Sequence, residues 1–163
     1  FPVGEIYGIG IDNDEPYNVY AGLQDHDSWK GPSNGWSGSI TLENWVPVGS
    51  DDGMYNVIDP TDSRWVYNTG QFGIHRRVDQ QKGIRVNIEP RPKQGEAKFR
   101  YNWCTPLHIS PHNTSTIYTG SQYLHRSTNR GDSWEIISPD LTSEFDFENG
   151  KRRTAPDDLR ILR

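Results

Sequence analysis

Three stretches of this chain share one pattern: an aliphatic residue precedes a tyrosine, and a glutamine follows four positions after that tyrosine. The tyrosines lie 47 and 51 residues apart. A repeat of about 50 residues indicates one supersecondary unit used several times, and such a unit usually cannot bury its apolar face alone. We therefore expect copies of one small element to pack side by side. The pattern occurs at Val19-Tyr20 with Gln24, at Val66-Tyr67 with Gln71, and at Ile117-Tyr118 with Gln122.

Each repeat divides into four short strand-like runs separated by turn residues. The 16 Gly and 11 Pro agree with frequent turns, and the six Trp and eight Tyr favour strands over helices. The second repeat has runs at 53–59, 65–69, 74–79 and 83–89. The first has runs at 6–11, 18–23, 27–30 and 45–49 with an insertion at 31–43, and the third has runs at 102–110, 116–120, 123–128 and 133–138.

Four antiparallel strands in a unit of this length are typical of a β-propeller blade. We predict an all-β fold, a partial β-propeller of about three four-stranded antiparallel blades. The blades would occupy 1–50, 51–92 and 93–140, and 141–163 would be a tail or the start of a further blade. Propellers typically have about 4–8 blades. The remaining blades would then come from the same protein or from a partner chain.

The overall composition excludes several classes of partner. The formal net charge of −5 provides no basic field for nucleic acid. No apolar run approaches the roughly 20 residues that a membrane helix needs. The single Cys104 cannot form an internal disulfide, and we interpret it as a buried thiol.

The hairpin at 127–134 reads Ser-Thr-Asn-Arg-Gly-Asp-Ser-Trp. It resembles the Asp-box, or BNR repeat, of bacterial neuraminidases, with Ser127 and Ser133 at the hydroxyl positions of the motif. We expect the Asn129 side chain to hold backbone amides of the turn and Gly131 to take a positive φ. We also expect Trp134 to pack into the blade at the start of its outer strand, and Trp45 to do the same in the first repeat.

Further stretches, 17–25, 49–55 with 58–60, and 101–107 with 110–112, resemble the sortilin-like branch of Asp-box propellers. Bacterial members of this branch are often labelled glycosyl hydrolases. The resemblance implies a larger propeller that is usually exported to the extracellular space, the periplasm or the cell envelope. It does not imply an activity.

When the four strands of a blade follow one another in chain order, the turns between the second and third strands lie on the same face of the propeller as the connections between blades. The resemblance implies that ligands bind on this face, around the central channel. The three glutamine amides either satisfy backbone groups of their own turns or form a ring that faces a polar ligand. The candidate ligand-binding residues are Gln24, His26, Asp52, Gln71, Phe72, Trp103, Gln122 and Tyr123.

Asp25 and Asp51 are the candidate catalytic residues, because they should converge at the junction of the first two blades. Glycoside hydrolysis needs two carboxyl groups about 5–5.5 Å apart for retention or about 6.5–9.5 Å apart for inversion. The alternative interpretation is that these aspartates cap turns. Ca²⁺ is a candidate ion at Asp51-Asp52 or at 12–14, but no recognised metal-ligand spacing occurs, so we expect no other metal or cofactor.

His75 and His125 are expected at matching strand positions, each before an arginine. We interpret both pairs as structural, with Arg76 and Arg126 pairing to neighbouring carboxylates or carbonyls. Trp29 and Trp36 flank a loop rich in Gly, Ser and Asn. Their rings could stack on sugars or could anchor the insertion onto its blade.

The sequence favours a non-catalytic interaction or ligand-binding segment of a larger exported propeller, whose ligand would be a protein, a peptide or a glycan. One alternative is a carbohydrate-active hydrolase that uses Asp25 and Asp51. Another is a purely structural subunit of a large assembly.

Overall fold

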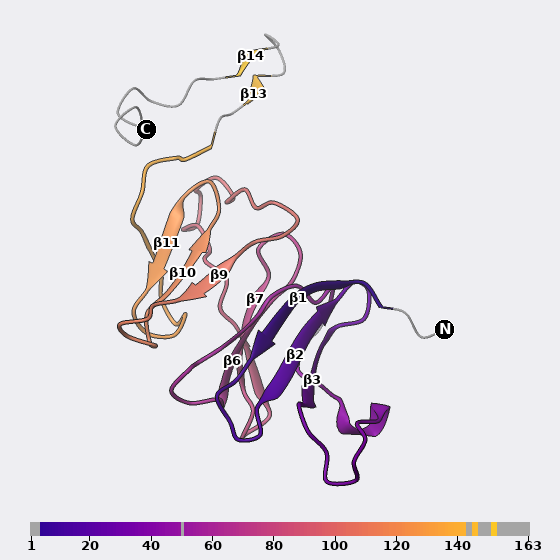
Figure 1. Cartoon of the computed structure of the whole chain (residues 1–163). Helices are drawn as coiled ribbons and strands as arrows, with labels where there is room; N and C mark the ends of the chain where they lie inside the picture. Colours follow the sequence, from indigo (N-terminus) through magenta and orange to yellow (C-terminus); the bar gives the residue numbers. More distant parts are fainter. Residues whose placement is uncertain (1–3, 50, 143–144, 147–150, 153–163) are drawn as a thin grey trace.

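The computed structural model describes residues 4–49, 51–142, 145–146 and 151–152. It confirms the predicted all-β fold, with three four-stranded antiparallel sheets arranged as a partial propeller and one short pair of strands in the tail (Figure 1). In each large sheet the strands follow one another in chain order. None of the described helices is long and apolar enough to cross a membrane.

Each of the twelve predicted runs overlaps one observed strand, although several strands are shorter than predicted. Two strands are much shorter than their predicted runs. The run expected at 45–49 contains only the strand Val46–Pro47, and the run expected at 102–110 contains only Leu107–Ile109. The first sheet contains β1 (Ile6–Ile11), β2 (Asn18–Leu23), β3 (Ser28–Pro32) and β4 (Val46–Pro47), and the second contains β5 (Asn56–Ile58), β6 (Trp65–Thr69), β7 (His75–Asp79) and β8 (Ile84–Asn87). The third contains β9 (Leu107–Ile109), β10 (Ile117–Gly120), β11 (Leu124–Ser127) and β12 (Glu135–Ile136).

The insertion in the first sheet forms a loop that ends in the 3-10 helix η1 (Leu42–Asn44). After the third sheet, β13 (Phe145–Asp146) pairs with β14 (Lys151–Arg152). The rest of the expected tail or further blade, residues 143–144, 147–150 and 153–163, lies outside the described residues.

The repeated tyrosines occupy equivalent places in the three sheets. In the antiparallel ladders Tyr20 lies opposite Lys30, Tyr67 opposite Arg77, and Tyr118 opposite Arg126. Successive side chains of a strand point to opposite faces of its sheet. Tyr20 and Tyr67 therefore face the following sheet, whereas Val66 and Ile117 face the preceding sheet.

Two apolar cores fill the spaces between the sheets. The core between the first and second sheets contains Tyr20, Val48, Ile58, Val66 and Val78. The core between the second and third contains Tyr67, Ile88, Leu107, Ile109 and Ile117. The innermost strand β5 contacts both β1 and β9, so the second sheet lies between the other two.

Each buried tyrosine hydroxyl meets the outer hairpin of the following sheet. Tyr20 donates to Asp12 (3.0 Å) and accepts a hydrogen bond from Gln80 of the second sheet (3.1 Å). The corresponding carboxylate in the second sheet, Asp59, is bound by Arg130 of the third sheet at 2.6 Å. Burial of Asp59 alone would raise its pKa, but the hydrogen bonds from Arg130 and neighbouring groups lower the pKa below its usual value.

Hydroxyl, amide and glycine groups fix the 127–134 hairpin much as its sequence predicts. The Ser127 Oγ accepts hydrogen bonds from the backbone N–H of Gly131 (2.8 Å) and Asn129 (3.3 Å). The Asn129 Oδ1 accepts a hydrogen bond from the backbone N–H of Ser133 (2.9 Å). The backbone amides of the turn are therefore bound by both Ser127 and Asn129, whereas we expected Asn129 alone to bind them. Gly131 has the expected positive φ of 93°, and the Trp134 Nε1 donates to the carbonyl oxygen of Ile88 (2.6 Å).

Gly131→Ala should lower the free energy of unfolding by more than about 1 kcal/mol, because alanine is strained at positive φ. An added Cβ would also lie only 2.7 Å from the Ile88 Cβ. Gly83→Ala in the equivalent hairpin is the matched control, since Gly83 also has a positive φ (63°) but open space around it. Urea denaturation monitored by tryptophan fluorescence measures both changes. If both variants lose the same free energy of unfolding, the close approach of Gly131 to Ile88 makes no contribution and the prediction is wrong.

Candidate functional site

The turns between the second and third strands of each sheet are hydrogen-bonded to the connections between sheets, so they form one continuous rim. We define the rim as the turns 23–27, 70–73 and 120–123 together with the connections 51–55 and 100–104. The Asp27 N–H donates to the Asp51 carbonyl (3.2 Å), the Phe72 N–H to the Trp103 carbonyl (3.1 Å), and the Arg100 N–H to the Gln122 Oε1 (2.8 Å). This is the face on which the resemblance to Asp-box propellers implies ligand binding.

The predicted convergence of aspartates at the first junction is present. The Asp25 N–H donates to the Asp52 Oδ1 at 2.7 Å, and Arg76 forms an ion pair with Asp51. Asp25, Asp27 and Asp51 all have φ near +60°, a region in which aspartate is better tolerated than most residues. The described residues provide no hydrogen-bond partner for the carboxylates of Asp25 and Asp27.

Asp25 and Asp51 differ in their surroundings from the carboxyl pair of a typical glycosidase. The general acid of such enzymes is usually shielded in an apolar environment. Asp25 is exposed on the rim, Asp51 is engaged by Arg76, and Asp52 is mostly buried as a cap on the Asp25 turn. The contacts of Asp51 and Asp52 therefore have a structural role. The carboxylates of Asp25, which is exposed, and Asp27, which is partly buried, have no such contact among the described residues.

Exposed aromatic rings form the second feature of the rim. Phe72 and Trp103 pack edge to face, with ring centroids 5.2 Å apart, although Phe72 remains 60% exposed and Trp103 38% exposed. The Trp103 Nε1 donates to the Tyr7 hydroxyl at 3.2 Å, which links the rim to the inner strand of the first sheet. Tyr7 was not predicted as a rim residue, because its partner Trp103 lies 96 positions away in the chain. The ion pair of Arg76 with Asp51 agrees with the expectation that this arginine pairs with a neighbouring carboxylate.

The three glutamines are equivalent in position but not in contacts. Gln122 is buried, and its Oε1 accepts a hydrogen bond from the Arg100 backbone N–H of a neighbouring connection, not from its own turn as the structural interpretation predicted. The Gln71 backbone pairs with Cys104, whereas its buried Oε1 has no partner among the described residues. Gln24 is only partly buried, so the three amides do not form a uniform ring.

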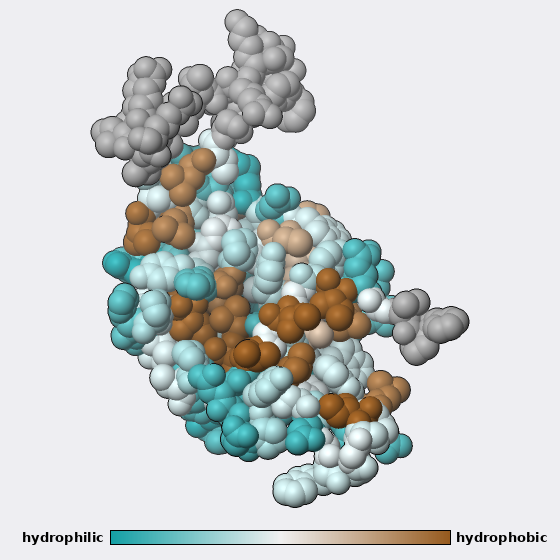
Figure 2. Space-filling view, viewed as in Figure 1, coloured by the Kyte–Doolittle hydropathy of each residue, from teal (hydrophilic) through white to brown (hydrophobic). Residues whose placement is uncertain are grey.

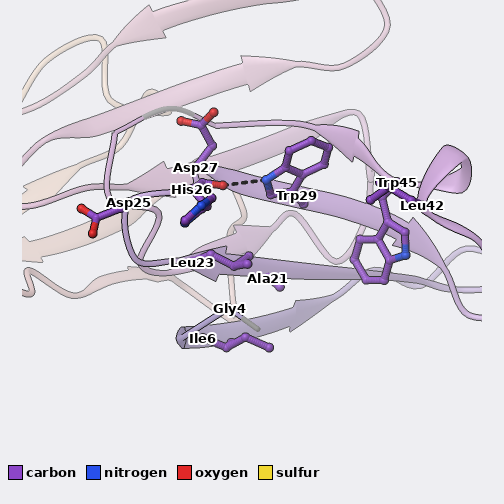
Figure 3. A pocket seen from close by; sticks show the side chains of 10 residues that line it. All are labelled: Gly4, Ile6, Ala21, Leu23, Asp25, His26, Asp27, Trp29, Leu42 and Trp45. Carbon is purple, nitrogen blue, oxygen red and sulfur yellow. Dashed lines mark hydrogen bonds between the residues drawn. The ribbon is translucent and has the colours of Figure 1, made fainter. Parts of the chain in front are cut away.

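Tyr123 and His26 are also fixed by local contacts. The ring of Tyr123 packs edge to face on Phe99, with centroids 6.1 Å apart. The His26 Nδ1 lies 2.9 Å from the Gln24 carbonyl oxygen, and the carbonyl of His26 accepts a hydrogen bond from the Trp29 Nε1 at 2.6 Å (Figure 3). Trp29 therefore anchors its own turn, whereas Trp36 in the insertion is fully exposed.

The Asp-rich segment at 12–14 has a clear structural role. The Asp12 carboxylate accepts hydrogen bonds from the Asn18 backbone N–H (2.7 Å), the Asn18 side chain (2.8 Å) and the Tyr20 hydroxyl (3.0 Å). Among the described residues, no three His, Cys, Asp or Glu side chains cluster in a way that could hold a metal ion.

A pocket that the sequence does not predict lies beside the Asp25–Asp27 turn, on the face of the first sheet that points away from the second (Figure 3). Its walls are mainly apolar, and the rings of Trp29 and Trp45 lie on the same side of the sheet as Leu23. Gly4, Ile6, Ala21, Leu23, Asp25, His26, Asp27, Trp29, Leu42 and Trp45 line it.

The two strand histidines are not at matching positions, although each precedes an arginine. His75 lies opposite Thr69, two residues after Tyr67, whereas His125 lies opposite Thr119, one residue after Tyr118. A shift of one residue turns a side chain to the other face of its sheet. The two histidines therefore point toward each other across one interface, where the His75 Nε2 lies 2.5 Å from the Thr119 Oγ1. Burial lowers the pKa of both, that of His75 to about 4.

A scan of known protein families finds no match to this chain, and a search of curated proteins finds no match either.

The free energy of unfolding should fall as the pH decreases from about 6.5 to about 4. In this window the unfolded chain binds a proton at His75 that the buried imidazole in the folded chain does not bind. The loss from this residue should reach at most about 3 kcal/mol. Urea denaturation at several pH values measures it. His75→Gln should reduce this pH dependence, and the lowered pKa of His125 should account for part of what remains.

Proposed function

We propose that this chain is a non-catalytic, ligand-binding part of a larger exported propeller of the Asp-box type, and that the rim binds the ligand. Further repeats or a partner chain would supply the remaining blades. The exposed edge-to-face pair of Phe72 and Trp103 carries this proposal. Aromatic rings at the polar mouth of a repeat fold provide contact area for a peptide side chain or a sugar ring.

The polar groups of the rim favour a role in ligand binding over a role in catalysis. Arg76 engages Asp51, and Asp52 caps the Asp25 turn, so two of the four carboxylates have structural partners. The remaining carboxylates of Asp25 and Asp27 could accept hydrogen bonds from the hydroxyl groups of a glycan or the amides of a peptide. Backbone bonds between turns and connections hold both carboxylates and rings in place before a ligand arrives.

Replacing either rim ring with alanine should weaken binding roughly tenfold or more, because each ring contributes buried apolar area and ring-packing energy. Titration calorimetry against a panel of neutral oligosaccharides and unstructured peptides would identify a ligand and then compare Phe72→Ala and Trp103→Ala with the unchanged chain. Trp36→Ala is the matched control, because Trp36 is an exposed tryptophan away from the rim. A ligand whose affinity depends on Trp36 and on neither rim ring would overturn the assignment.

The carbohydrate-hydrolase alternative has one observation in its favour: Asp25 and Asp27 carry carboxylates without hydrogen-bond partners among the described residues, close to Asp51. A reducing-sugar assay on the same oligosaccharides tests it. We expect no release of sugar by either the unchanged chain or the Asp25→Asn/Asp51→Asn variant. If the unchanged chain releases sugar and the double variant does not, the protein is a hydrolase that uses these aspartates.

A further inference from the structure

Tyr7 reaches the rim because the strand β1 is irregular at this residue. The ladder between β1 and β2 passes from the pair Ile6–Leu23 directly to the pair Gly8–Gly22. Tyr7 is therefore the extra residue of a β-bulge and has no partner in the ladder. A bulge bends its strand and re-aims the side chain that it carries.

The bulge removes Tyr7 from the row of side chains that β1 directs away from the second sheet. A Cβ on Gly8 would lie only 3.0 Å from atoms of the second sheet, so the neighbouring positions of a regular strand point the other way. Ile9 and Ile11 do so, and Figure 2 shows hydrophobic surface over β1. Tyr7 instead lies against Trp103, whose Nε1 donates to the Tyr7 hydroxyl at 3.2 Å.

Three aromatic side chains from separate elements thus form one surface on the rim. Trp103 is held by Tyr7 on one side and by Phe72 on the other, with the rings of Trp103 and Phe72 edge to face. The Phe72 backbone N–H also donates to the Trp103 carbonyl (3.1 Å). The indole is therefore fixed in position by the fold, while Phe72 and Trp103 keep 60% and 38% of their surface exposed.

The turn that carries Asp25 and Asp27 lies beside this aromatic surface. The Asp52 carboxylate accepts a hydrogen bond from the Asp25 N–H (2.7 Å). The carbonyl oxygen of Asp52 lies 3.6 Å from the place that a Cβ would take on Gly70, two residues before Phe72. One residue thus links the aspartate turn to the turn of the exposed phenylalanine.

The aspartate turn is also attached to the start of β1. The Gln24 N–H donates to the Glu5 carbonyl (2.9 Å), two residues before Tyr7. The contacts between Tyr7, its neighbours and the two turns therefore run in a closed circuit through the first and second sheets and the connection to the third. Rings and carboxylates border the same part of the rim.

The charge of the rim is mainly negative. Its turns and connections contain four aspartates and a single arginine, Arg100, which pairs with Asp140 at 2.8 Å. Two of the aspartates have the structural contacts described above. The carboxylates of Asp25 and Asp27 have no hydrogen-bond partner among the described residues, so their charge acts on whatever approaches the rings. Such a surface repels an anion and attracts a cation.

We propose that the rim binds a lysine or arginine side chain of an extended peptide, an inference that rests on the proposed binding role of the rim. The alkyl part of this side chain would pack on Phe72 and Trp103, and its charged group would lie near Asp25 and Asp27. A cation over an aromatic face is also attracted by the quadrupole of the ring. A neutral sugar would contact the rings and gain nothing from the charge of the carboxylates.

Binding of short capped peptides tests this selectivity. The probes are acetyl-Gly-Ser-Lys-Ser-Gly-amide and the same peptide with norleucine or Nε-acetyl-lysine in place of lysine. The indole Nε1–H signal of Trp103 in ¹H–¹⁵N NMR spectra, assigned by its loss in Trp103→Phe, reports contact at the rim. We expect the lysine peptide to bind at least about fivefold more tightly than either neutral peptide, and the difference to shrink in about 0.5 M salt.

Charge variants separate the carboxylates of the rim from the overall charge of the chain. Asp25→Asn/Asp27→Asn should abolish the preference for lysine and leave the affinity for the norleucine peptide unchanged, because the rings remain. Glu15→Gln/Glu43→Gln is the matched control, since it removes two exposed negative charges outside the rim. This control should keep the preference. A preference that survives in the aspartate variant would contradict the proposal.

Tyr7→Phe tests the aromatic part of the site separately. This change removes the acceptor of the Trp103 Nε1 and leaves every charge in place. All three peptides should therefore bind more weakly by a similar factor, with the preference for lysine retained. A loss confined to the lysine peptide would mean that the Tyr7 hydroxyl contacts the cation itself and does not act by positioning Trp103, contrary to the proposal.

The probes also separate the failure of this proposal from the failure of the rim as a binding site. If all three peptides shift the Trp103 signal with equal affinity, the rim binds ligands but does not select a cation. If methyl β-glucoside shifts the signal and the lysine peptide does not, the ligand is a sugar and the peptide assignment is wrong. If neither peptides nor sugar shift it, the proposed binding role of the rim is wrong as well.

Discussion

The burial of one sheet face against the next is the constraint on which the rest of this structure depends. A four-stranded sheet of such short strands has two apolar faces and cannot cover either by itself. Here Tyr67 from the second sheet and Ile117 from the third meet in one core, and Tyr20 and Val66 meet in the other. Because every sheet uses the same register, the same residue types meet at both interfaces.

The rim is a consequence of this packing. Once the sheets are stacked about their inner strands, the turns after β2, β6 and β10 open on one side, together with the connections between the sheets. The contact between Trp103 and Tyr7 shows how far this effect reaches, since the two residues belong to different sheets and lie 96 positions apart. The aromatic surface that we propose as the binding site therefore exists only when the sheets are assembled.

Much of the fold could be predicted because its signals are local and repeated. The spacing of Tyr20, Tyr67 and Tyr118 and the turn residues between runs located all twelve strands, and the Ser127–Trp134 pattern predicted a positive φ at Gly131. The site was only partly predictable. The convergence of Asp25 and Asp51 follows from strand order, but the ion pair of Asp51 with Arg76 depends on how neighbouring turns meet. His75 follows Tyr67 by eight residues and His125 follows Tyr118 by seven. The prediction of matching positions overlooked this difference, and the ladders show that it turns the two histidines to opposite faces of their own sheets.

The sequence by itself determined the repeat, the strand order and the face on which the turns gather, because hydrophobic alternation and turn residues act over a few positions along the chain. Only the tertiary structure decided which equivalent residues are covered. Ile109 and Ile11 have the same place in their sheets, yet one is buried and the other exposed, because burial depends on a neighbouring sheet and not on local sequence. The same reason leaves Trp45 at the wall of a pocket, while Trp134 is fixed by the carbonyl of Ile88.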